Sequence, residues 1–422
     1  MLVLIDLDGT LTDTAHARFK PFKDGLEETA VQTIPVIEGA EEFIAELQKQ
    51  GHTPLIISDS HPKYVNKIAK QIFRIPALSL ADKPNSAKTL AFLKATHPNV
   101  TDIKSEAVVI GDTWLDIELG RALNCPTVLT NFYTASSEES RDGIGQTWKH
   151  LKSGPTFCAD KYADIYAILD SPAKHLLAAE AAFQNSTSSR AAKLKTYKSD
   201  SGFIVYRALG RQNSGESDKY AVADIYSEFQ RANRTTETLQ KLARSVEIYL
   251  SHVVDSLPNV HWDYITYLSD KPTTMPPNKM RELFDLIQTP IVKKDLLLWK
   301  SNVKGSIKNQ PDRQHRSEFV SEYLAISNSP ELKDKNIIIL DDQFTTGGTA
   351  DLICKKLKEL QVKRIIFVTL FYLTSPVQSD KLCPICGKQM SIKIRKSDGR
   401  KFYSCTPPKY KGSGCGQIVN IN

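Results

Sequence analysis

The sequence lacks long apolar runs, internal repeats and a dense set of cysteines. No apolar run approaches the roughly eighteen residues that a membrane-spanning helix needs, so we expect no membrane partner. Seven cysteines in 422 residues are too few for a secreted scaffold held by disulfides. The first strand is expected to begin at Leu2, which leaves no room for a signal peptide. These absences predict a cytoplasmic protein.

Most of the chain also lacks a charge excess. The whole chain carries 55 basic and 48 acidic residues, a formal net charge of +7. Residues 380–422 hold nine basic and two acidic residues and account for the whole excess. With 41% apolar and 24% charged residues, the composition is that of a globular protein. A length of 422 residues suits two domains and a small module.

The segment Asn336–Ala350 predicts a buried strand, a phosphate-binding turn and a helix. Four apolar residues lead into Asp341 and Asp342, whose carboxylates can accept hydrogen bonds from vicinal sugar hydroxyls. In the turn, a glycine pair permits close backbone approach, threonines add hydroxyl donors, and the next helix directs its first N–H groups at an anion. A 5-phosphorylated ribose fits both halves. The residues of this Thr/Gly loop are Thr345, Thr346, Gly347, Gly348 and Thr349.

This segment resembles the phosphoribosyl pyrophosphate (PRPP) motif of type I phosphoribosyltransferases, and the region before it resembles their ComF-like branch. Trp262–Leu268 predicts a strand that opens into Ser269–Lys271, where the family binds pyrophosphate. A basic loop follows, from Lys300 to Arg316. The resemblance implies that this loop closes over pyrophosphate; a solvated connection is the alternative. Its candidate charge-neutralising residues are Lys308, Arg313 and Arg316.

A second motif lies at the start of the chain, where Met1–Asp13 predicts a short apolar strand followed by two carboxylates. Asp6 and Asp8 are spaced to flank one backbone carbonyl. Hard oxygen ligands of this kind suit Mg²⁺, which keeps waters and a phosphate oxygen in its remaining positions.

This pattern resembles motif I of the haloacid-dehalogenase (HAD) phosphatases, and three later pieces follow in the family's order. Pro54–Ser58 predicts a strand that ends in a hydroxyl, Lys83 matches the lysine that neutralises phosphate charge, and Val108–Asp116 predicts a strand followed by two acids. Lys88 and Ser60 are rivals for Lys83 and Ser58. No large cap domain fits between these pieces.

The HAD resemblance implies a role for each residue. Asp6 would be the nucleophile that forms an aspartyl-phosphate, and Asp8 the general acid and then the base. Ser58 would hold the phosphoryl group. The implied Mg²⁺ ligands are Asp6, Asp8 and Asp112, with Asp116 completing the site around them.

The C-terminal segment contains four cysteines in two pairs. Four thiolates in this spacing suit a tetrahedral structural zinc site, and the intervening residues predict a hairpin with its turn at Asp398-Gly399. The pattern is similar to the zinc ribbons at the C-termini of bacterial type I topoisomerases. Basic residues interleaved with aromatic ones suit single-stranded nucleic acid, although a solvated basic hairpin is the alternative. The predicted zinc ligands are Cys383, Cys386, Cys405 and Cys415.

The fold class expected is α/β, with two doubly wound domains and a small zinc ribbon held by the four cysteines. The HAD-like phosphatase domain is expected at 1–165 and the phosphoribosyltransferase-like domain at 201–378. A helical connector and linker is expected between them at 166–200, and the ribbon at 379–422.

The combination predicts a bifunctional enzyme of nucleotide metabolism, a Mg²⁺-dependent phosphatase fused to a PRPP-dependent transferase. Its expected partners are PRPP or a phosphorylated nucleotide, and single-stranded nucleic acid at the ribbon. The alternative is a regulator, in stress or phage defence, that senses PRPP or a nucleotide without turnover and carries the phosphatase. The sequence does not specify the phosphoribosyl acceptor, the phosphatase substrate, the oligomeric state, or whether the ribbon takes DNA, RNA or protein.

Overall fold

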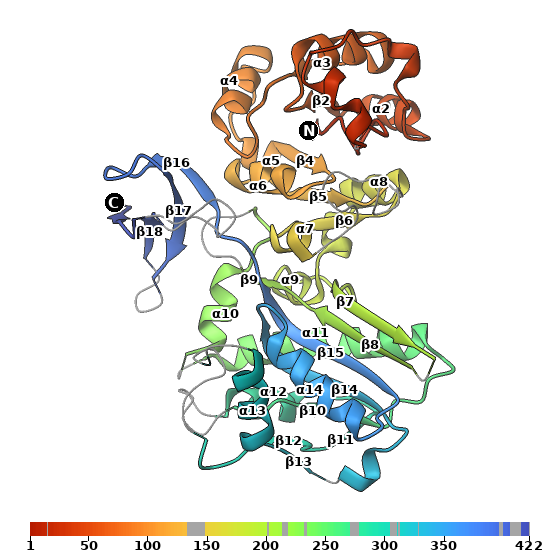
Figure 1. Cartoon of the computed structure of the whole chain (residues 1–422), viewed down its shortest axis with the longest axis vertical. Helices are drawn as coiled ribbons and strands as arrows, with labels where there is room; N and C mark the ends of the chain where they lie inside the picture. The colour runs from red at the N-terminus through yellow and green to blue at the C-terminus, as the bar shows by residue number, and fades with distance from the viewer. Residues whose placement is uncertain are drawn as a thin grey trace. The chain divides into compact units, whose positions relative to one another are not determined.

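The computed structural model describes residues 1–14, 16–132, 148–200, 202–212, 218–231, 234–270, 278–303, 310, 313–327, 329–395, 400–405 and 415–421. The chain divides into two compact units, and it has an α/β fold (Figure 1). The first unit comprises Met1–Pro172, Asn213–Ala221 and Thr374–Asn422, and the second comprises Ala173–Gln212 and Val222–Leu373. No helix in the described ranges is long and apolar enough to cross a bilayer.

The first unit contains a parallel six-stranded sheet with the doubly wound order β3-β2-β1-β4-β5-β6. The central strands β1, β2 and β4 are almost wholly buried, as expected for parallel strands that helices cover. The strands are β1 (Leu2–Ile5), β2 (Thr53–Ile57), β3 (Ala77–Leu78), β4 (Ala107–Gly111), β5 (Thr127–Thr130) and β6 (Phe157–Ala159). The helices include α1 (Lys20–Lys23), α2 (Ala40–Lys49), α3 (Pro62–Ile68), α4 (Ala87–Thr96), α6 (Trp114–Ala122) and α8 (Tyr162–Asp170).

The register of this sheet decides where its polar residues meet. Strand β1 lies between β2 and β4, with Ile5 opposite both Ile56 and Ile110. All three strands run in the same direction, so the residues that directly follow them lie at one edge of the sheet. In open parallel sheets this carboxyl edge is where ligands bind.

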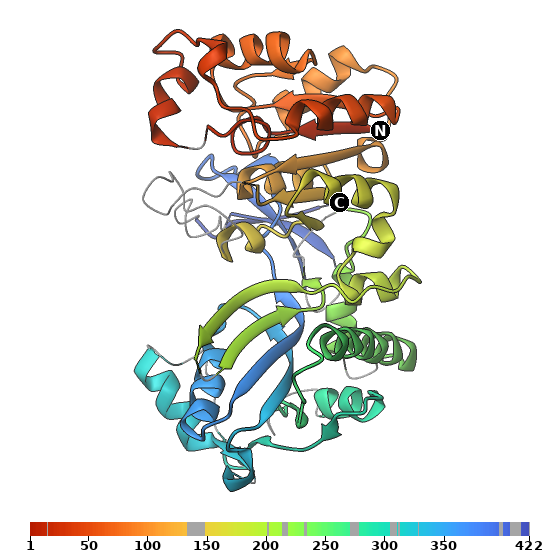
Figure 2. The same cartoon turned by 90° about the vertical axis from the view of Figure 1, so that its right-hand side faces the viewer.

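The second unit contains a mixed sheet with the order β11-β10-β14-β15-β8-β7, and β9 pairs with β15. Every pairing is parallel except that of β7 with β8, the two yellow-green strands in Figure 2. The strands are β7 (Ala192–Ser199), β8 (Gly202–Ala208), β9 (Arg211–Gln212), β10 (Tyr264–Tyr267), β11 (Val292–Lys293), β14 (Asn336–Phe344) and β15 (Arg364–Leu373). The helices include α9 (Ala178–Phe183), α10 (Ala223–Phe229), α11 (Thr236–Ser256), α12 (Lys279–Leu286), α13 (Arg313–Tyr323) and α14 (Gly348–Glu359).

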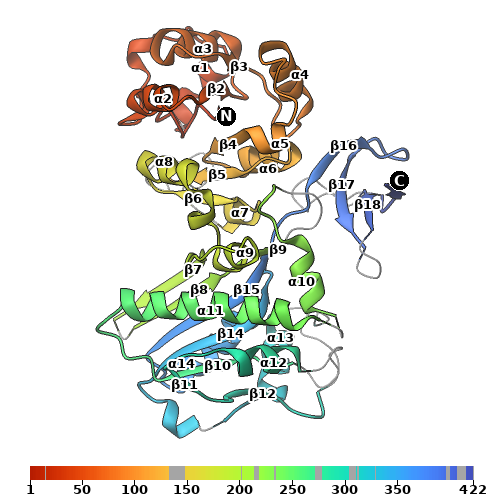
Figure 3. The same ribbon diagram turned by 180° about the vertical axis from the view of Figure 1, so that it is seen from behind.

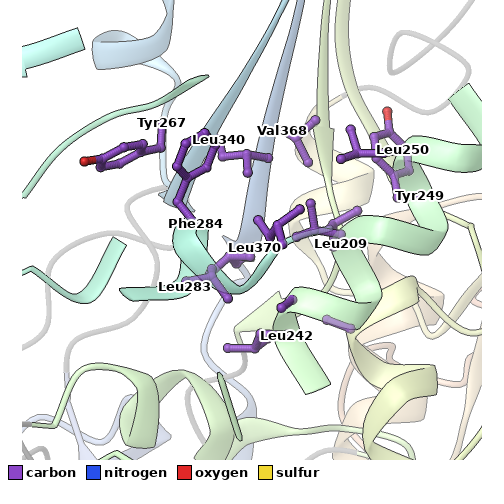
Figure 4. Close-up of a cluster of buried hydrophobic side chains, with 14 of the residues drawn as sticks. Leu209, Leu242, Tyr249, Leu250, Tyr267, Leu283, Phe284, Leu340, Val368 and Leu370 are labelled. Atoms are coloured by element: carbon purple, nitrogen blue, oxygen red, sulfur yellow. The ribbon is translucent and has the colours of Figure 1, made fainter. Parts of the chain in front are cut away.

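Helices lie on both faces of this sheet. Figure 3 shows α11 on one face, and the opposite view in Figure 1 shows α14 on the other. The α11 side chains Leu242 and Leu250 belong to one buried apolar cluster with Leu340 and Val368 of the sheet (Figure 4). Burial of each such side chain contributes about 1.5–3 kcal/mol, so this cluster holds β14 in place.

Three features of the second unit differ from the sequence-based expectation. Residues 192–199 form strand β7, where an exposed linker is expected, because their backbone N–H and C=O groups pair with those of β8. Strand β14 does not end at the carboxylate pair but continues through it to Phe344, paired with β15. The expected basic loop becomes helix α13 from Arg313 onward. Lys308 lies outside the described residues, as do the side chains of Arg313 and Arg316.

The C-terminal residues form a small antiparallel sheet in the order β16-β17-β18-β19. Pairing of β17 with β18 confirms the predicted hairpin, whereas its Asp398-Gly399 turn lies outside the described residues. Its buried cluster contains Met390 and two cysteines, with Tyr403 and Val419 packed against them. A core this small needs an additional staple to fold. The strands are β16 (Gln378–Leu382), β17 (Gln389–Ile394), β18 (Lys401–Ser404) and β19 (Ile418–Asn420).

A buried ion pair between α9 and β9 yields the first prediction. Arg211 Nε donates to Glu180 Oε1 at 2.7 Å, Nη2 donates to Oε2 at 3.2 Å, and both side chains are fully buried. Glu180→Ala leaves the guanidinium buried without its carboxylate, which costs about 3–5 kcal/mol. We expect the urea midpoint, followed by tryptophan fluorescence to which Trp262 and Trp299 of the same unit contribute, to fall strongly.

The matched control is Asp285→Ala, which removes the exposed i,i+4 partner of Arg281 in the same unit. Exposed pairs of this kind contribute little, so its midpoint should stay near that of the unaltered protein. Equal midpoints for the two variants would contradict the importance of the buried pair.

Candidate active sites and metal centre

Three carboxylates, of which Asp6 and Asp116 are buried and Asp112 is half-buried, form an acidic cluster at the carboxyl edge of the first sheet. Asp6 follows β1, Asp112 follows β4 and Asp116 lies in the first turn of α6; their oxygens all lie within 4.8 Å of one another. Burial, and after it the neighbouring Asp116, raises the pKa of Asp6 well above its ordinary value. The same two causes raise the pKa of Asp112 to about 7. Three acids this close do not all ionise without a cation.

Lys83 supplies one cation to this cluster. Its Nζ donates to Asp6 Oδ1 at 2.6 Å and to Asp116 Oδ1 at 2.5 Å, and its side chain is only 5% exposed. Burial disfavours the charged ammonium, but Asp116 and Asp6 outweigh it and hold the pKa of Lys83 well above its usual range. The rival Lys88 is exposed and donates to the Leu80 carbonyl instead. Of the two lysines, the structure brings Lys83 to the acids.

A second set of hydrogen bonds fixes Asp116, the carboxylate that binds Lys83. Its Oδ2 accepts hydrogen bonds from the Thr113 N–H at 3.1 Å and the Thr113 hydroxyl at 2.8 Å, which caps α6. Both oxygens of Asp116 therefore have protein partners. By contrast, Asp112 Oδ1 is buried and has no hydrogen-bond partner among the described residues.

Asp8 stands apart from the acidic cluster. Its carboxylate accepts hydrogen bonds from Thr14, Ser60 and Tyr64. Ser58, which follows β2, is buried, and its Oγ accepts from the Ser60 N–H at 3.1 Å. Thr14 and Tyr64 have no counterpart in the motif pattern, since a single polar residue beside or within a helix gives no signal in the sequence.

The acidic cluster fits a divalent cation such as Mg²⁺. Its donors are hard carboxylate oxygens, and Asp112 Oδ1 is left without a protein partner among the described residues. Gly9 makes room for Asp112: at its φ of +92°, a Cβ would lie 2.3 Å from Asp112 Oδ2. The Asp8 carboxylate lies outside the three-acid group, so the cluster differs there from the expected ligand set.

A second polar site lies on β14 of the other sheet. Asp341 and Asp342 are part of the strand, and Asp341 Oδ1 accepts from the Asp342 N–H at 2.8 Å. Burial, and then the adjacent Asp342, raises the pKa of Asp341 well above its ordinary value. Asp342 Oδ2 accepts from Gln230 Nε2 at 3.1 Å and from the buried ammonium of Lys279, which also lies 3.5 Å from Asp270 Oδ1.

The Thr/Gly loop follows directly and leads into α14. Gly347 is the N-cap residue of α14 with φ +80°, where a Cβ would lie 2.5 Å from the Phe344 ring and 2.9 Å from Lys195 Nζ. Lys195 Nζ lies 3.2 Å from Asp351 Oδ2 in the first turn of α14. Thr345 and Thr349 are half-buried and Thr346 is exposed. The loop therefore combines a left-handed Gly347 with the N-terminus of α14, and an additional lysine lies beside it.

Lys195 reaches the loop from strand β7. The sequence predicts a linker for the residues of this strand. A register shift in the β7–β8 pairing between Lys193 and Lys195 sets Lys195 opposite Tyr206. Irregularities of this kind can re-aim a side chain, and they leave no trace in a single sequence.

The four C-terminal cysteines come together as predicted. Their sulfur atoms lie within 4.8 Å of one another, with Cys383 3.4 Å from Cys415 and Cys386 3.3 Å from Cys405. The Lys388 N–H, followed by Cys405, lowers the pKa of Cys386 to about 6. Four sulfur donors converging from two turns fit a structural Zn²⁺ site.

Comparison with known proteins identifies one domain in the chain. Residues 294–390 match the family model described as "Phosphoribosyl transferase domain". This range contains Asp341, Asp342 and the Thr/Gly loop. No curated protein matches the chain.

Several solved structures are similar to about two fifths of the chain. A putative phosphatase from Clostridium difficile is 17% identical, with a TM-score of 0.31, over 40% of this chain and 97% of that one. A hydrolase from Pseudomonas syringae is 18% identical, with a TM-score of 0.31, over 40% and 99%. D,D-heptose 1.7-bisphosphate phosphatase from B. bronchiseptica, complexed with magnesium and phosphate, is 12% identical, with a TM-score of 0.29, over 40% and 98%. Values this low carry no argument about activity.

Gly9 provides a test of the cation site. If Mg²⁺ binds the acidic cluster, saturation at about a hundred times its dissociation constant stabilises the protein by about 2.7 kcal/mol. Gly9→Ala forces a side chain against Asp112, so most of the Mg²⁺-dependent rise in melting temperature should disappear.

Gly51→Ala is the matched control, because Gly51 also has a positive φ of +77° but no atom within 4 Å of its Cβ position. It should lose some stability from backbone strain and keep the full Mg²⁺ response. If both variants kept the full Mg²⁺ response, that result would count against a cation at this cluster.

The cysteine cluster provides a second test. We expect the purified protein to hold one zinc ion per chain, and Cys386→Ser to lose it, because three sulfur ligands no longer close the tetrahedron. Inductively coupled plasma mass spectrometry measures the stoichiometry. Cys158→Ser, which alters a cysteine outside the cluster, should retain the ion. Equal zinc content in both variants would disprove the site.

Proposed function

We propose that the chain is a bifunctional enzyme of nucleotide metabolism. Its first activity is a HAD-type, Mg²⁺-dependent hydrolysis of phosphomonoesters through an aspartyl-phosphate, and its second is PRPP-dependent phosphoribosyl transfer. The observation that carries the first activity is the Lys83 ammonium shared between Asp6 and Asp116 beside Asp112. The matched domain at 294–390, with two acids ahead of the Thr/Gly loop, supports the second.

In the phosphatase step, an Asp6 oxygen attacks phosphorus and the bond from phosphorus to the leaving oxygen breaks. The leaving oxygen keeps the bonding electron pair and takes a proton from Asp8. A water then attacks the aspartyl-phosphate, gives its proton to Asp8, and releases inorganic phosphate and the Asp6 carboxylate. Lys83 neutralises phosphate charge, and the Ser58 hydroxyl holds a phosphoryl oxygen.

Asp6 and Asp112, together with the backbone carbonyl of Asp8, are the groups we assign to Mg²⁺, and Asp116 holds Lys83 beside them. The ion would neutralise negative charge as the phosphoryl group transfers. The protein's own contribution is the burial of these groups, which strengthens every charge interaction in the site.

In the transferase step, a nitrogen nucleophile forms a bond to the anomeric carbon of PRPP. The bond from that carbon to pyrophosphate breaks, the electron pair leaves with pyrophosphate, and the nitrogen gives up its proton. Asp341 and Asp342 would accept hydrogen bonds from the ribose hydroxyls, while the Thr/Gly loop and Lys195 bind the 5-phosphate. The segment from Lys300 to Arg316 would shield the leaving group.

One observation favours a second candidate function for this site. Lys279 and Gln230 both donate to Asp342, so a ribose hydroxyl would meet a carboxylate that already has partners. A sensor that binds PRPP or a nucleotide without turnover, in a nucleic-acid-binding regulator, is compatible with that arrangement. Release of pyrophosphate distinguishes an enzyme from such a sensor.

We assign residues 1–165 to the phosphatase, 201–378 to the transferase and 379–422 to a zinc ribbon that binds single-stranded nucleic acid in the cytoplasm. The support for the ribbon's role is its charge, with nine basic residues against two acidic ones from 380 onward. The pairing of β7 with β8 extends the transferase-like sheet into the 166–200 segment.

Separate product assays test both activities. With Mg²⁺ and an alkyl phosphate, Asp6→Asn should abolish release of inorganic phosphate, because the nucleophile is lost. With PRPP and a panel of bases, Asp342→Ala should abolish release of pyrophosphate. Each variant serves as the control for the other, since the two residues belong to different units.

Phosphate release that survives in Asp6→Asn would contradict the phosphatase assignment. A protein that binds PRPP but releases no pyrophosphate with any base would favour the sensor over the transferase.

Lys195 yields a separate prediction about ligand affinity. A charged hydrogen bond to phosphate contributes about 1.5–3 kcal/mol, so Lys195→Met should weaken ribose 5-phosphate binding by about tenfold or more. Isothermal titration calorimetry measures the affinity. Lys193→Met, an exposed lysine two positions earlier on the same strand, should bind as tightly as the unaltered protein. Equal affinities for the two variants would remove Lys195 from the phosphate site.

A further inference from the structure

The Asp8 carboxylate is held by side chains outside the four motif segments of the proposed phosphatase. Oδ1 accepts from the Thr14 hydroxyl at 2.7 Å and from the Tyr64 hydroxyl at 2.8 Å. Oδ2 accepts from the Ser60 hydroxyl at 2.8 Å. Among the described residues, one oxygen of Asp8 therefore has two hydroxyl partners and the other has one.

Lys23 completes this arrangement from α1. Its Nζ donates to the Thr14 carbonyl at 2.6 Å and lies 3.8 Å from Asp8 Oδ1, and its side chain is only 6% exposed. A buried lysine with so little access to solvent needs a charge partner, and Asp8 is the carboxylate that the structure pairs with it. Lys23 thus fixes both the backbone at Thr14 and the charge beside Oδ1.

The two helices that supply these groups are joined next to the carboxylate. Tyr64 lies on α3 and is fully buried, and its hydroxyl is also 3.1 Å from Thr14 Oγ1. The His61 N–H, just before α3, donates to the Lys23 carbonyl at 2.7 Å. Lys23, Thr14 and Tyr64 therefore form one connected scaffold around Oδ1.

The contacts hold the Asp8 carboxylate at both of its oxygens. Oδ1 has the Tyr64 and Thr14 hydroxyls and, 3.8 Å away, the Lys23 ammonium, whereas Oδ2 has the Ser60 hydroxyl. Removal of Tyr64 or Lys23 would take a partner from Oδ1 and leave the carboxylate freer to turn.

We propose that Tyr64 and Lys23 are positioning residues that hold the Asp8 carboxylate in place to protonate the leaving oxygen of the substrate. The inference rests on the proposed phosphatase function. When the bond from phosphorus to oxygen breaks, the electron pair remains on the leaving oxygen. An aliphatic alkoxide is a poor leaving group and needs the Asp8 proton, whereas a nitrophenolate stabilises the pair within its ring.

The test compares two substrates in the full chain with Mg²⁺, glycerol 2-phosphate and p-nitrophenyl phosphate. The quantity measured is kcat/KM, which covers the steps up to leaving-group release and excludes the later hydrolysis of the aspartyl-phosphate. General acid catalysis contributes about 10²–10⁴-fold, so partial misplacement of Asp8 in Tyr64→Phe should lower kcat/KM for glycerol 2-phosphate by about tenfold or more. For p-nitrophenyl phosphate we expect a change of less than about threefold, because that leaving group needs little proton transfer.

Asp8→Asn and the double variant Asp8→Asn/Tyr64→Phe show whether Tyr64 acts through Asp8. If it does, Tyr64→Phe causes no further loss once the acid is absent. Tyr166→Phe is the matched control, because its hydroxyl donates to the Phe43 carbonyl in the same unit and not to Asp8. Lys23→Met should shift the substrate preference in the same direction as Tyr64→Phe, and it provides a second variant if Tyr64→Phe does not fold.

An equal fall of kcat/KM for both substrates would show a merely structural role and overturn the proposal, as would unchanged values for both. An unaltered protein that hydrolyses neither substrate would instead overturn the proposed phosphatase, and this inference with it.

Discussion

The constraint on which the first site depends is the close approach of three carboxylates, two of them buried, around one lysine. Asp6, Asp112 and Asp116 lie too close together for all three to be ionised without a cation. The Lys83 ammonium binds two of them, Asp6 and Asp116. Gly9 must lack a side chain for Asp112 to fit, and the capping bonds of α6 fix Asp116. The arrangement therefore fits a divalent cation, whose two positive charges would balance the excess of three carboxylates over one ammonium.

The second unit meets the same constraint in a different way. Lys279 neutralises Asp270 and Asp342 from within the protein, and Gln230 adds a hydrogen bond to Asp342. The position of the Asp342 carboxylate is thereby set before any ligand would bind there. Preorganisation of this kind lowers the cost of ordering the site when the ligand binds. Both units thus place buried acids on a sheet and balance them with a lysine from another element.

Residues that directly follow an apolar strand can be predicted from the sequence, because parallel strands end at a common edge. Asp6, Ser58 and Asp112 are of this kind, and the cysteine spacing likewise predicts the sulfur cluster that the structure shows. Lys195 and Tyr64 are not predictable in this way. Lys195 depends on a register shift in β7, and Tyr64 on the packing of α3 against the first motif. Neither feature has a periodic signature, so only the folded chain reveals them.

The most direct test of the account is to trap the phosphorylated enzyme. The full chain would be mixed with Mg²⁺ and an alkyl phosphate, quenched in acid within milliseconds, and analysed by mass spectrometry of intact protein and peptides. The account predicts one phosphoryl group per chain, acid-stable and alkali-labile, on the peptide that contains Asp6 and absent from Asp6→Asn. A phosphoryl group on another residue, or rapid turnover without any covalent intermediate, would contradict it.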